Sequence, residues 1–296
     1  MARRGSALWR VLLSVRDGAG AEAAARALDP VVESVSAFAA DGEWQVEGFS
    51  RKKPDGAALA ANLALQWLGM GVAPSALIER VPERDWLGEN QKSFTPVSAG
   101  RYFIHPTSWR GQIPASRIAL RIDAATAFGT GEHGSTRGVL IALDRLAKRR
   151  RFRRVLDMGC GTGILSMAAA RTFGRPIALY DIDPEAVRVA SRNAVVNGLK
   201  PLLMPRRAHS YRERAVRRGG PYDLVLANIL ARPLMLMARD LARVLAPDGV
   251  AVLGGFLPWQ EASVRAAHRA RRIVLARRIT VDGWTTLIVS RRKFPA

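Results

Sequence analysis

A glycine-rich loop preceded by an acid is the part of the chain best suited to binding a small molecule. Residues 155–163 read VLDMGCGTG, between a short apolar segment and a helical one. The glycines permit a tight turn and let a ligand lie against the backbone, above all at Gly159 and Gly161. Dinucleotide-binding folds prefer Gly-x-Gly-x-x-Gly, and here the third glycine comes one residue early. Asp157, before the loop, suits a ligand with a positive end and no pyrophosphate, such as S-adenosylmethionine.

A second acid follows the next apolar segment. Asp181 ends the segment 177–182, and in doubly wound folds an acid at this place binds the ribose hydroxyls of a nucleoside. Asp183 precedes Pro184, a favoured first residue of a helix, so we interpret Asp183 as the helix cap. Asp183 as the ribose ligand remains the alternative. Together, the glycine loop and Asp181 predict nucleoside binding.

Asn228 ends a third buried segment, 222–227. Ligands in this architecture bind at the carboxyl ends of the strands, and a carboxamide there can accept a hydrogen bond from an amine. The alternative is that Asn228 only caps the following helix. We predict that it orients an attacking amine.

The segment 127–136 reads AFGTGEHGST and precedes a helix. Three glycines, hydroxyls and the Phe128 ring predict a mobile segment over a pocket. His133 could act as a general base, but a packed or solvent-facing role is the favoured interpretation. Cys160 has no basic partner nearby in sequence and is interpreted as a small loop residue. The remaining histidines lack ligand-like spacing, and we predict no metal site.

The chain divides into two parts by pattern. Residues 1–100 alternate strand, helix, two strands and helix, which predicts a small α+β domain without catalytic groups, suited to recognition. Residues 101–115 are expected to form a linker rich in aromatic residues, Pro and Gly. From residue 116 to 296, strands and helices alternate, which predicts a doubly wound α/β domain with a mostly parallel sheet.

The charge is strongly positive, with a formal net charge of +21. Only six of the 46 basic residues are Lys, and the others are Arg. The basic residues are densest at 148–154, 206–218 and 269–278. Solvated surfaces are the favoured explanation, and an anionic partner such as RNA is the alternative. The single cysteine excludes a disulfide framework and fits a reducing cytosol. No apolar run reaches about 18 residues, so we expect a cytoplasmic protein without a membrane span.

Taken together, these motifs resemble the ribosomal-protein methyltransferase family PrmA, whose members modify large-subunit ribosomal protein eleven. The resemblance rests on the 127–136 segment, the glycine loop, 181–184 (DIDP) and 227–234 (ANILARPL). It also reaches residues 85–103 and Trp284, and so covers most of the chain. Glu132 and Gly134 depart from the residues expected in this family.

The resemblance implies a class I, Rossmann-like methyltransferase fold with a small ferredoxin-like N-terminal domain that grips the ribosomal protein. It implies S-adenosylmethionine as cofactor and lysine side chains and the N-terminal amine as methyl acceptors. Thr136, Gly159, Asp181 and Asn228 match the family's cofactor-contacting positions. Phe128 and Thr130 match its loop over the active site, and with Asn228 they are the expected catalytic residues.

Three other functions remain open on sequence alone. The charge suits an RNA methyltransferase, and the same chemistry could serve a lysine methyltransferase of a non-ribosomal protein. A non-catalytic protein could also retain the nucleoside-binding fold. The sequence carries no prediction of oligomeric state.

Overall fold

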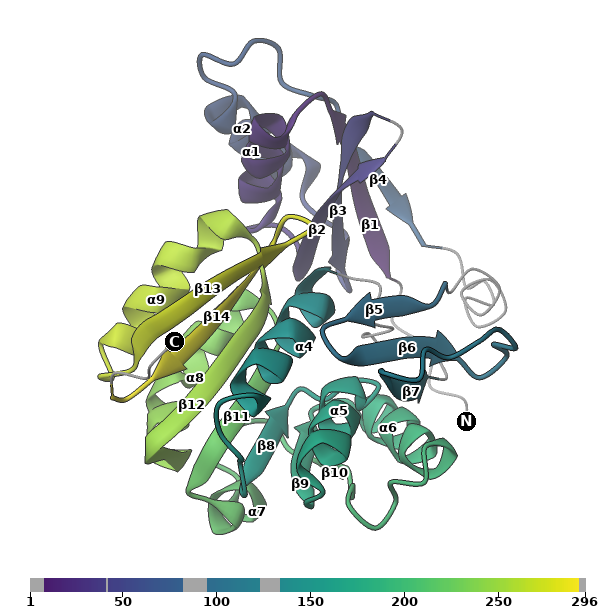
Figure 1. The fold of residues 1–296 in the computed structure, drawn as a ribbon. Helices are drawn as coiled ribbons and strands as arrows, with labels where there is room; N and C mark the ends of the chain where they lie inside the picture. The colour runs from purple at the N-terminus through teal and green to yellow at the C-terminus, as the bar shows by residue number, and fades with distance from the viewer. Residues whose placement is uncertain (1–7, 41, 82–94, 123–133, 293–296) are drawn as a thin grey trace, which may run out of the picture. The chain divides into compact units, whose positions relative to one another are not determined.

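A computed structural model describes residues 8–40, 42–81, 95–122 and 134–292. The chain forms two compact units, Met1–Arg84 and Asp85–Ala296. Each unit has its own sheet and its own buried side chains, and each is described by itself (Figure 1).

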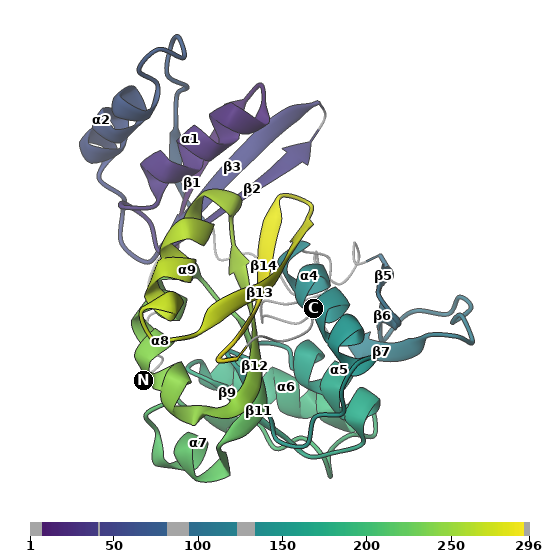
Figure 2. The ribbon, with the colours of Figure 1, turned by 60° about the vertical axis from the view of Figure 1, so that its left-hand side comes forward.

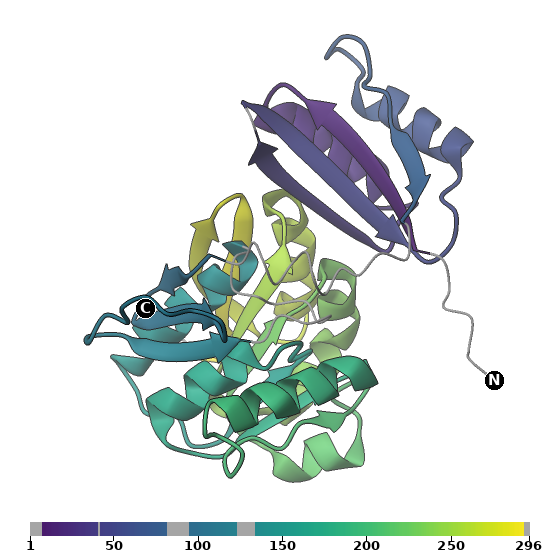
Figure 3. The same ribbon diagram turned by 90° about the vertical axis from the view of Figure 1, so that its right-hand side faces the viewer.

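The N-terminal unit is a four-stranded antiparallel sheet with two helices on one face, as Figure 3 shows. Its elements are β1 (Trp9–Val15), α1 (Gly18–Leu28), β2 (Ser34–Ala40), β3 (Glu43–Ser50), α2 (Gly56–Gln66) and β4 (Leu77–Arg80). The strand order β2-β3-β1-β4 with this chain order is the ferredoxin-like arrangement, as expected. In β1, Val11, Leu13 and Val15 are buried at every second position, which places one face of the strand in the core. Asp17 begins α1, and its carboxylate accepts a hydrogen bond from Gly20 N at 2.7 Å.

The C-terminal unit is built on a seven-stranded sheet of order β10-β9-β8-β11-β12-β14-β13. Its strands are β8 (Val155–Met158), β9 (Ile177–Asp181), β10 (Arg206–Arg207), β11 (Tyr222–Asn228), β12 (Leu245–Phe256), β13 (Val274–Val281) and β14 (Trp284–Ser290). Strands β8 to β12 pair in parallel, and β14 pairs antiparallel with both neighbours. The order reverses between β8 and β11, and in such sheets ligands bind beyond the carboxyl ends of the strands at this point.

Helices cover both faces of this sheet, as Figure 2 shows most clearly for α4 and α5 on one side and α8 and α9 on the other. The helices are α4 (Gly134–Ala147), α5 (Ile164–Phe173), α6 (Pro184–Val196), α7 (Arg214–Gly219), α8 (Ala231–Val244) and α9 (Glu261–Arg269). Alternate side chains of β11 enter the two cores: Leu224 and Leu226 pack under α4, and Val225 and Ala227 pack under α8. The doubly wound architecture is therefore confirmed.

A small three-stranded sheet precedes α4 and differs from the linker expected at 101–115. It contains β5 (Val97–Ala99), β6 (Tyr102–Pro106) and β7 (Ile118–Ile122), with β6 parallel to β7. The buried Tyr102 hydroxyl lies 2.7 Å from Thr172 Oγ1 on α5, which ties β6 to the second unit. The compact second unit begins at Asp85, ahead of the expected boundary, and it includes these three strands, whose buried side chains share a core with α4 and α5.

Candidate active site

The glycine loop between β8 and α5 adopts a conformation that L side chains disfavour. Gly159, Gly161 and Gly163 have φ values of +77°, +52° and +81°. A Cβ at Gly159 would lie 2.2 Å from Cγ2 of Ile229, so glycine is required there for space as well as for φ. The loop thus brings bare backbone to the carboxyl end of β8, as the sequence predicted.

The end of β9 holds this loop in place. Gly159 N and Cys160 N donate to the carbonyl oxygen of Tyr180 at 2.8 and 3.0 Å. Gly161 N donates to Asp181 Oδ2 at 2.9 Å, and Asp183 N donates to Asp181 Oδ1 at 2.9 Å. An ionised carboxylate has about four acceptor positions, so the two oxygens of Asp181 retain capacity for hydroxyl donors. Asp181 therefore shapes the loop and also has the chemistry expected of a ribose ligand.

Asp183 is the cap of α6. Its Oδ1 accepts a hydrogen bond from Glu185 N at 2.8 Å, and Pro184 is the first residue of the helix. Gly198, just past the helix end, has a φ of +66°. These features confirm the interpretation of Asp183 as the helix cap.

The Asn228 side chain at the end of β11 contacts α4 instead of capping α8. Its Nδ2 donates to Thr136 Oγ1 at 3.2 Å, and Thr136 is fully buried. The N-cap of α8 is Leu230, which has no side-chain cap bond. Asn228 Oδ1 is buried and has no hydrogen-bond partner within the described residues. An unsatisfied buried acceptor is costly unless a ligand supplies the donor, so Oδ1 is suited to an amine N–H.

Space beside Asn228 Oδ1 depends on Gly254 in β12. A Cβ on Gly254 would lie 2.9 Å from Asn228 Oδ1 and 2.7 Å from Val139 Cγ2. Both contacts are shorter than ordinary van der Waals contact. Glycine at this position therefore lets the carboxamide oxygen lie close to the backbone of β12.

Asp157 is a fully buried carboxyl group behind the glycine loop. Ser166 Oγ donates to its Oδ2 at 2.6 Å, and its Oδ1 has no partner among the described residues. Burial raises the pKa of Asp157 to about 7; the Ser166 hydrogen bond opposes this shift, and the Asp181 carboxylate adds to it. A cation nearby would stabilise the ionised form. The sequence indicated an acid for a positive ligand but did not reveal Ser166.

The other candidate groups are structural or lie outside the described residues. Cys160 is buried, and burial raises the pKa of its thiol well above the ordinary value, which suits an inert loop residue. Phe128 and Thr130 fall at 123–133, which the structure does not describe, and His133 falls there too. Within the described ranges no group of His, Cys, Asp and Glu could hold a metal ion.

Comparisons with known proteins agree with this geometry. The model of the family described as "Ribosomal protein L11 methyltransferase (PrmA)" matches residues 16–292. A Caulobacter sp. (strain K31) protein named ribosomal protein L11 methyltransferase is 40% identical over 280 residues, covering 92% of this chain and 94% of that protein. Its Bradyrhizobium diazoefficiens counterpart is 39% identical over 279 residues, covering 91% and 94%.

One solved structure adds a match in three dimensions. The crystal structure of a ribosomal protein L11 methylase from Lactobacillus delbrueckii subsp. bulgaricus has a TM-score of 0.61 and 25% identity. The match covers 67% of this chain and 100% of that chain. A family match over nearly the whole length, with the glycine loop, Asp181 and Asn228 at the carboxyl ends of β8, β9 and β11, leads to one conclusion. The chain belongs to the ribosomal protein L11 methyltransferase (PrmA) family.

Proposed function

We propose that this protein transfers methyl groups from S-adenosylmethionine to amines of ribosomal protein L11, namely lysine side chains and the N-terminal amine. Family membership over residues 16–292 supports the substrate and the reaction. The observation that carries the chemistry is the buried Oδ1 of Asn228 at the carboxyl end of β11, which has no hydrogen-bond partner among the described residues.

The residues at the carboxyl ends of the strands fit S-adenosylmethionine. Asp181 would accept from the ribose hydroxyls, and the backbone at Gly159 and Gly161 would lie against the cofactor. Asp157 Oδ1 has no partner among the described residues, and the ionised carboxylate would complement the charge of the cofactor's ammonium group. Thr136 would complete the site. When bound, the cofactor supplies an electrophilic methyl group on a sulfonium.

The protein's main task is to present a neutral amine in line with that methyl group. A free lysine has a pKa near ~10.4, so deprotonation at pH 7 costs about 4–5 kcal/mol. A desolvated pocket lowers that cost because it disfavours the ammonium form. Asn228 Oδ1 would accept one amine N–H and so direct the nitrogen lone pair, while the bond to Thr136 holds the carboxamide. Phe128 and Thr130, outside the described residues, are the proposed covering loop.

We assign recognition of the ribosomal protein to the N-terminal unit. Four large apolar side chains are exposed at and after the end of α2: Leu65, Leu68, Met70 and Val72. An exposed apolar group of this kind is typical of a protein-binding surface. With recognition on a separate unit, one catalytic site could reach several amines of the same substrate.

Two further features belong to the proposal. No helix in the described part of the chain is long and apolar enough to cross a membrane. We place the activity in the cytoplasm, where ribosomal proteins are made. The positive charge supports a weak contact with RNA in addition to the protein substrate, and an RNA methyltransferase is the alternative that this charge favours.

Mass spectrometry of ribosomal proteins after deletion of the gene tests the proposal in cells. We expect L11 to lose its methyl groups while the ribosomal RNA keeps its own. Fully methylated L11 in the deletion strain, or a loss confined to ribosomal RNA, would contradict the proposed substrate.

A further inference from the structure

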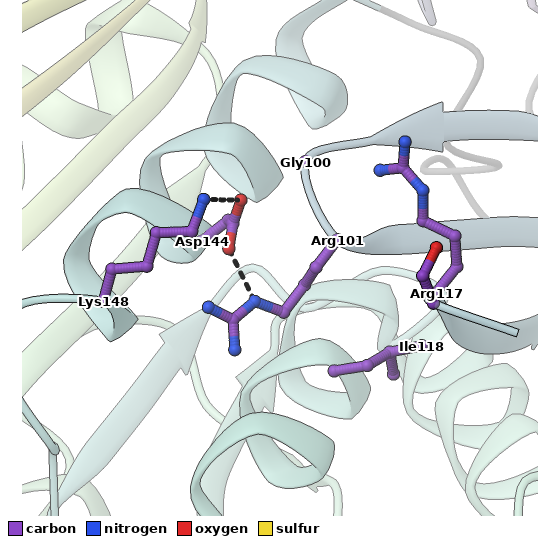
Figure 4. Close-up of a pocket in the computed structure, with 7 residues that line it drawn as sticks. Gly100, Arg101, Arg117, Ile118, Asp144 and Lys148 are labelled. Carbon is purple, nitrogen blue, oxygen red and sulfur yellow. Dashed lines mark hydrogen bonds and ion pairs between the residues drawn. The ribbon is translucent and has the colours of Figure 1, made fainter.

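Basic side chains line a hollow of about 500 Å³ at the end of α4 that is remote from the glycine loop. Helix α4 runs back toward the amino end of β8, whereas the candidate active site lies at the carboxyl ends of the strands. Figure 4 shows the hollow, which is lined by Gly100, Arg101, Ser116, Arg117, Ile118, Asp144 and Lys148. Three cationic side chains and one carboxylate leave a net charge of +2.

The carboxylate in this hollow is already occupied. Asp144 Oδ1 accepts from Arg101 Nε at 2.5 Å, and Asp144 Oδ2 lies 3.2 Å from Lys148 Nζ. Arg117 is exposed and has no side-chain partner within the described residues. Figure 4 shows its guanidinium directed away from these ion pairs. An anion at the hollow could therefore approach the Arg117 guanidinium without displacing an ion pair among the described residues.

A second basic hollow, of about 290 Å³, lies beside the starts of β8, β9 and β11. Arg153, Arg154 and Arg206 line it, and all three are exposed. The nearby acid Asp223 accepts hydrogen bonds from the backbone N–H groups of Arg153 and Arg154 at 2.8 and 2.9 Å. The Asp223 carboxylate therefore binds the backbone of these two residues and forms no ion pair with their guanidinium groups.

The connection between α4 and β8 joins the two hollows. Residues 148–154 read KRRRFRR, with Lys148 at the first hollow and Arg153 at the second. Phe152 is buried and anchors the connection. At ~3.6 Å per residue, Lys148 and Arg153 lie at most about 18 Å apart. Within the connection, Arg150 pairs with Asp248 at 2.9 Å, whereas Arg151 and Arg153 are exposed. We call residues 148–154 and the two hollows that they join the basic connection surface.

We propose that the basic connection surface binds the phosphate backbone of single-stranded RNA. This inference rests on the proposed RNA contact and gives it a place away from the methyl-transfer site. Guanidinium groups suit phosphate because they donate two parallel hydrogen bonds. A regularly charged strand can meet both hollows at once, within the roughly 4–16 nucleotides that single-strand sites cover. Phosphate contacts carry no sequence information, so binding is independent of base sequence. Among the described residues that line the hollows no aromatic ring is exposed, so the affinity rests on charge.

Fluorescence anisotropy with short labelled RNA strands, read across a salt series, tests the proposal on the full-length protein. The test variant carries Arg117→Ala, Arg151→Ala and Arg153→Ala together, because these side chains are exposed and have no partner among the described residues. Loss of three phosphate contacts should make the slope of log K against log salt shallower by about 2. Affinity at about 0.1 M salt should fall at least ~10-fold.

The matched control removes the same charge elsewhere. Arg239→Ala, Arg269→Ala and Arg271→Ala change exposed arginines on α8 and at the end of α9. This control should keep the wild-type salt slope. Equal weakening by both triple variants would reject a localised surface and leave only diffuse charge. Tighter binding to polyglutamate than to RNA would reject a nucleic acid as the occupant.

Methylation of RNA-free L11 separates this inference from the proposed function. Both triple variants should methylate L11 at the wild-type rate, because the basic connection surface lies away from Asn228 and the glycine loop. Reduced RNA binding with full methylation supports the inference. Loss of methylation in the test variant alone would contradict the separation of this surface from the active site. Failure of the wild-type protein to methylate L11 would instead reject the proposed function.

Discussion

Replacing Asn228 should have different effects on the stability of the protein and on the rate of methyl transfer. Asn228→Ala removes one hydrogen bond, from Nδ2 to Thr136 Oγ1, which is worth about 0.5–1.5 kcal/mol. It also removes the buried, unpartnered Oδ1, whose isolation costs about 1–3 kcal/mol. These effects oppose each other. We expect the free energy of unfolding of the cofactor-free protein to change by an amount between a loss of about 0.5 kcal/mol and a gain of about 2.5 kcal/mol.

The effect on methyl transfer should be much larger. A hydrogen bond that orients reacting groups in the transition state contributes about 3–4 kcal/mol, or about 10²–10³ in rate. Asn228→Ala should therefore lower kcat for L11 methylation about 10²-fold or more, with a small change in cofactor affinity. Single-turnover methyl transfer at saturating cofactor measures the first quantity, and calorimetry measures the second.

Asn228→Asp is the matched control, because it keeps an acceptor oxygen at the same place. Its negative charge should hold the acceptor amine as ammonium at neutral pH, so its activity should recover as the pH rises. Asn228→Ala should show no such recovery. Normal turnover in Asn228→Ala would refute the reasoning. A parallel loss of turnover and cofactor affinity would make Asn228 a cofactor ligand instead.

Three further predictions concern the cofactor site and the two units. Asp181→Ala should weaken S-adenosylmethionine binding by about 1.5–3 kcal/mol, because the ribose hydroxyls and Gly161 N lose their acceptor; unchanged affinity by calorimetry would remove Asp181 from the site. Asp157 has a pKa of about 7 in the folded protein and an ordinary value of 3.8, so the unfolded chain loses this proton at lower pH than the folded protein. The contribution of the protonated group to the free energy of unfolding should be complete below about pH 4 and lost as the pH rises through about 7. In denaturant unfolding across this pH range, Asp157→Asn should reduce the slope of unfolding free energy against pH by up to about 1.4 kcal/mol per pH unit. Equal slopes in the variant and the wild-type protein would contradict the raised pKa. A fragment beginning at Asp85 should bind the cofactor but lose most activity on intact L11; full activity would reject recognition by the N-terminal unit.

The elements around the glycine loop could be predicted because their signals are local. The segment 155–158 is wholly apolar apart from Asp157, and it forms β8 as expected. Asp183, Pro184 and Gly198 mark both ends of α6 through capping and positive φ, which depend only on neighbouring residues. The alternation of short segments predicted a small α+β domain at the N-terminus, and the family resemblance implied its ferredoxin-like arrangement.

The features that the sequence did not reveal depend on contacts between distant segments. β4 is short and partly exposed, so it lacks an apolar alternation, and β6 is stabilised by pairing with β7. The hydrogen bond from Asn228 to Thr136 joins residues 92 apart in the chain. Ser166 reaches Asp157 only because α5 folds back against β8. Such pairs carry no spacing signal in one sequence.

Transfer of labelled methyl groups to purified L11, with RNA removed by nuclease, tests the central claim most directly. The full-length protein with S-adenosylmethionine should label L11 on lysine side chains and the N-terminal amine, and added RNA should not be required. Label found only on naked ribosomal RNA, with L11 unlabelled, would contradict the account.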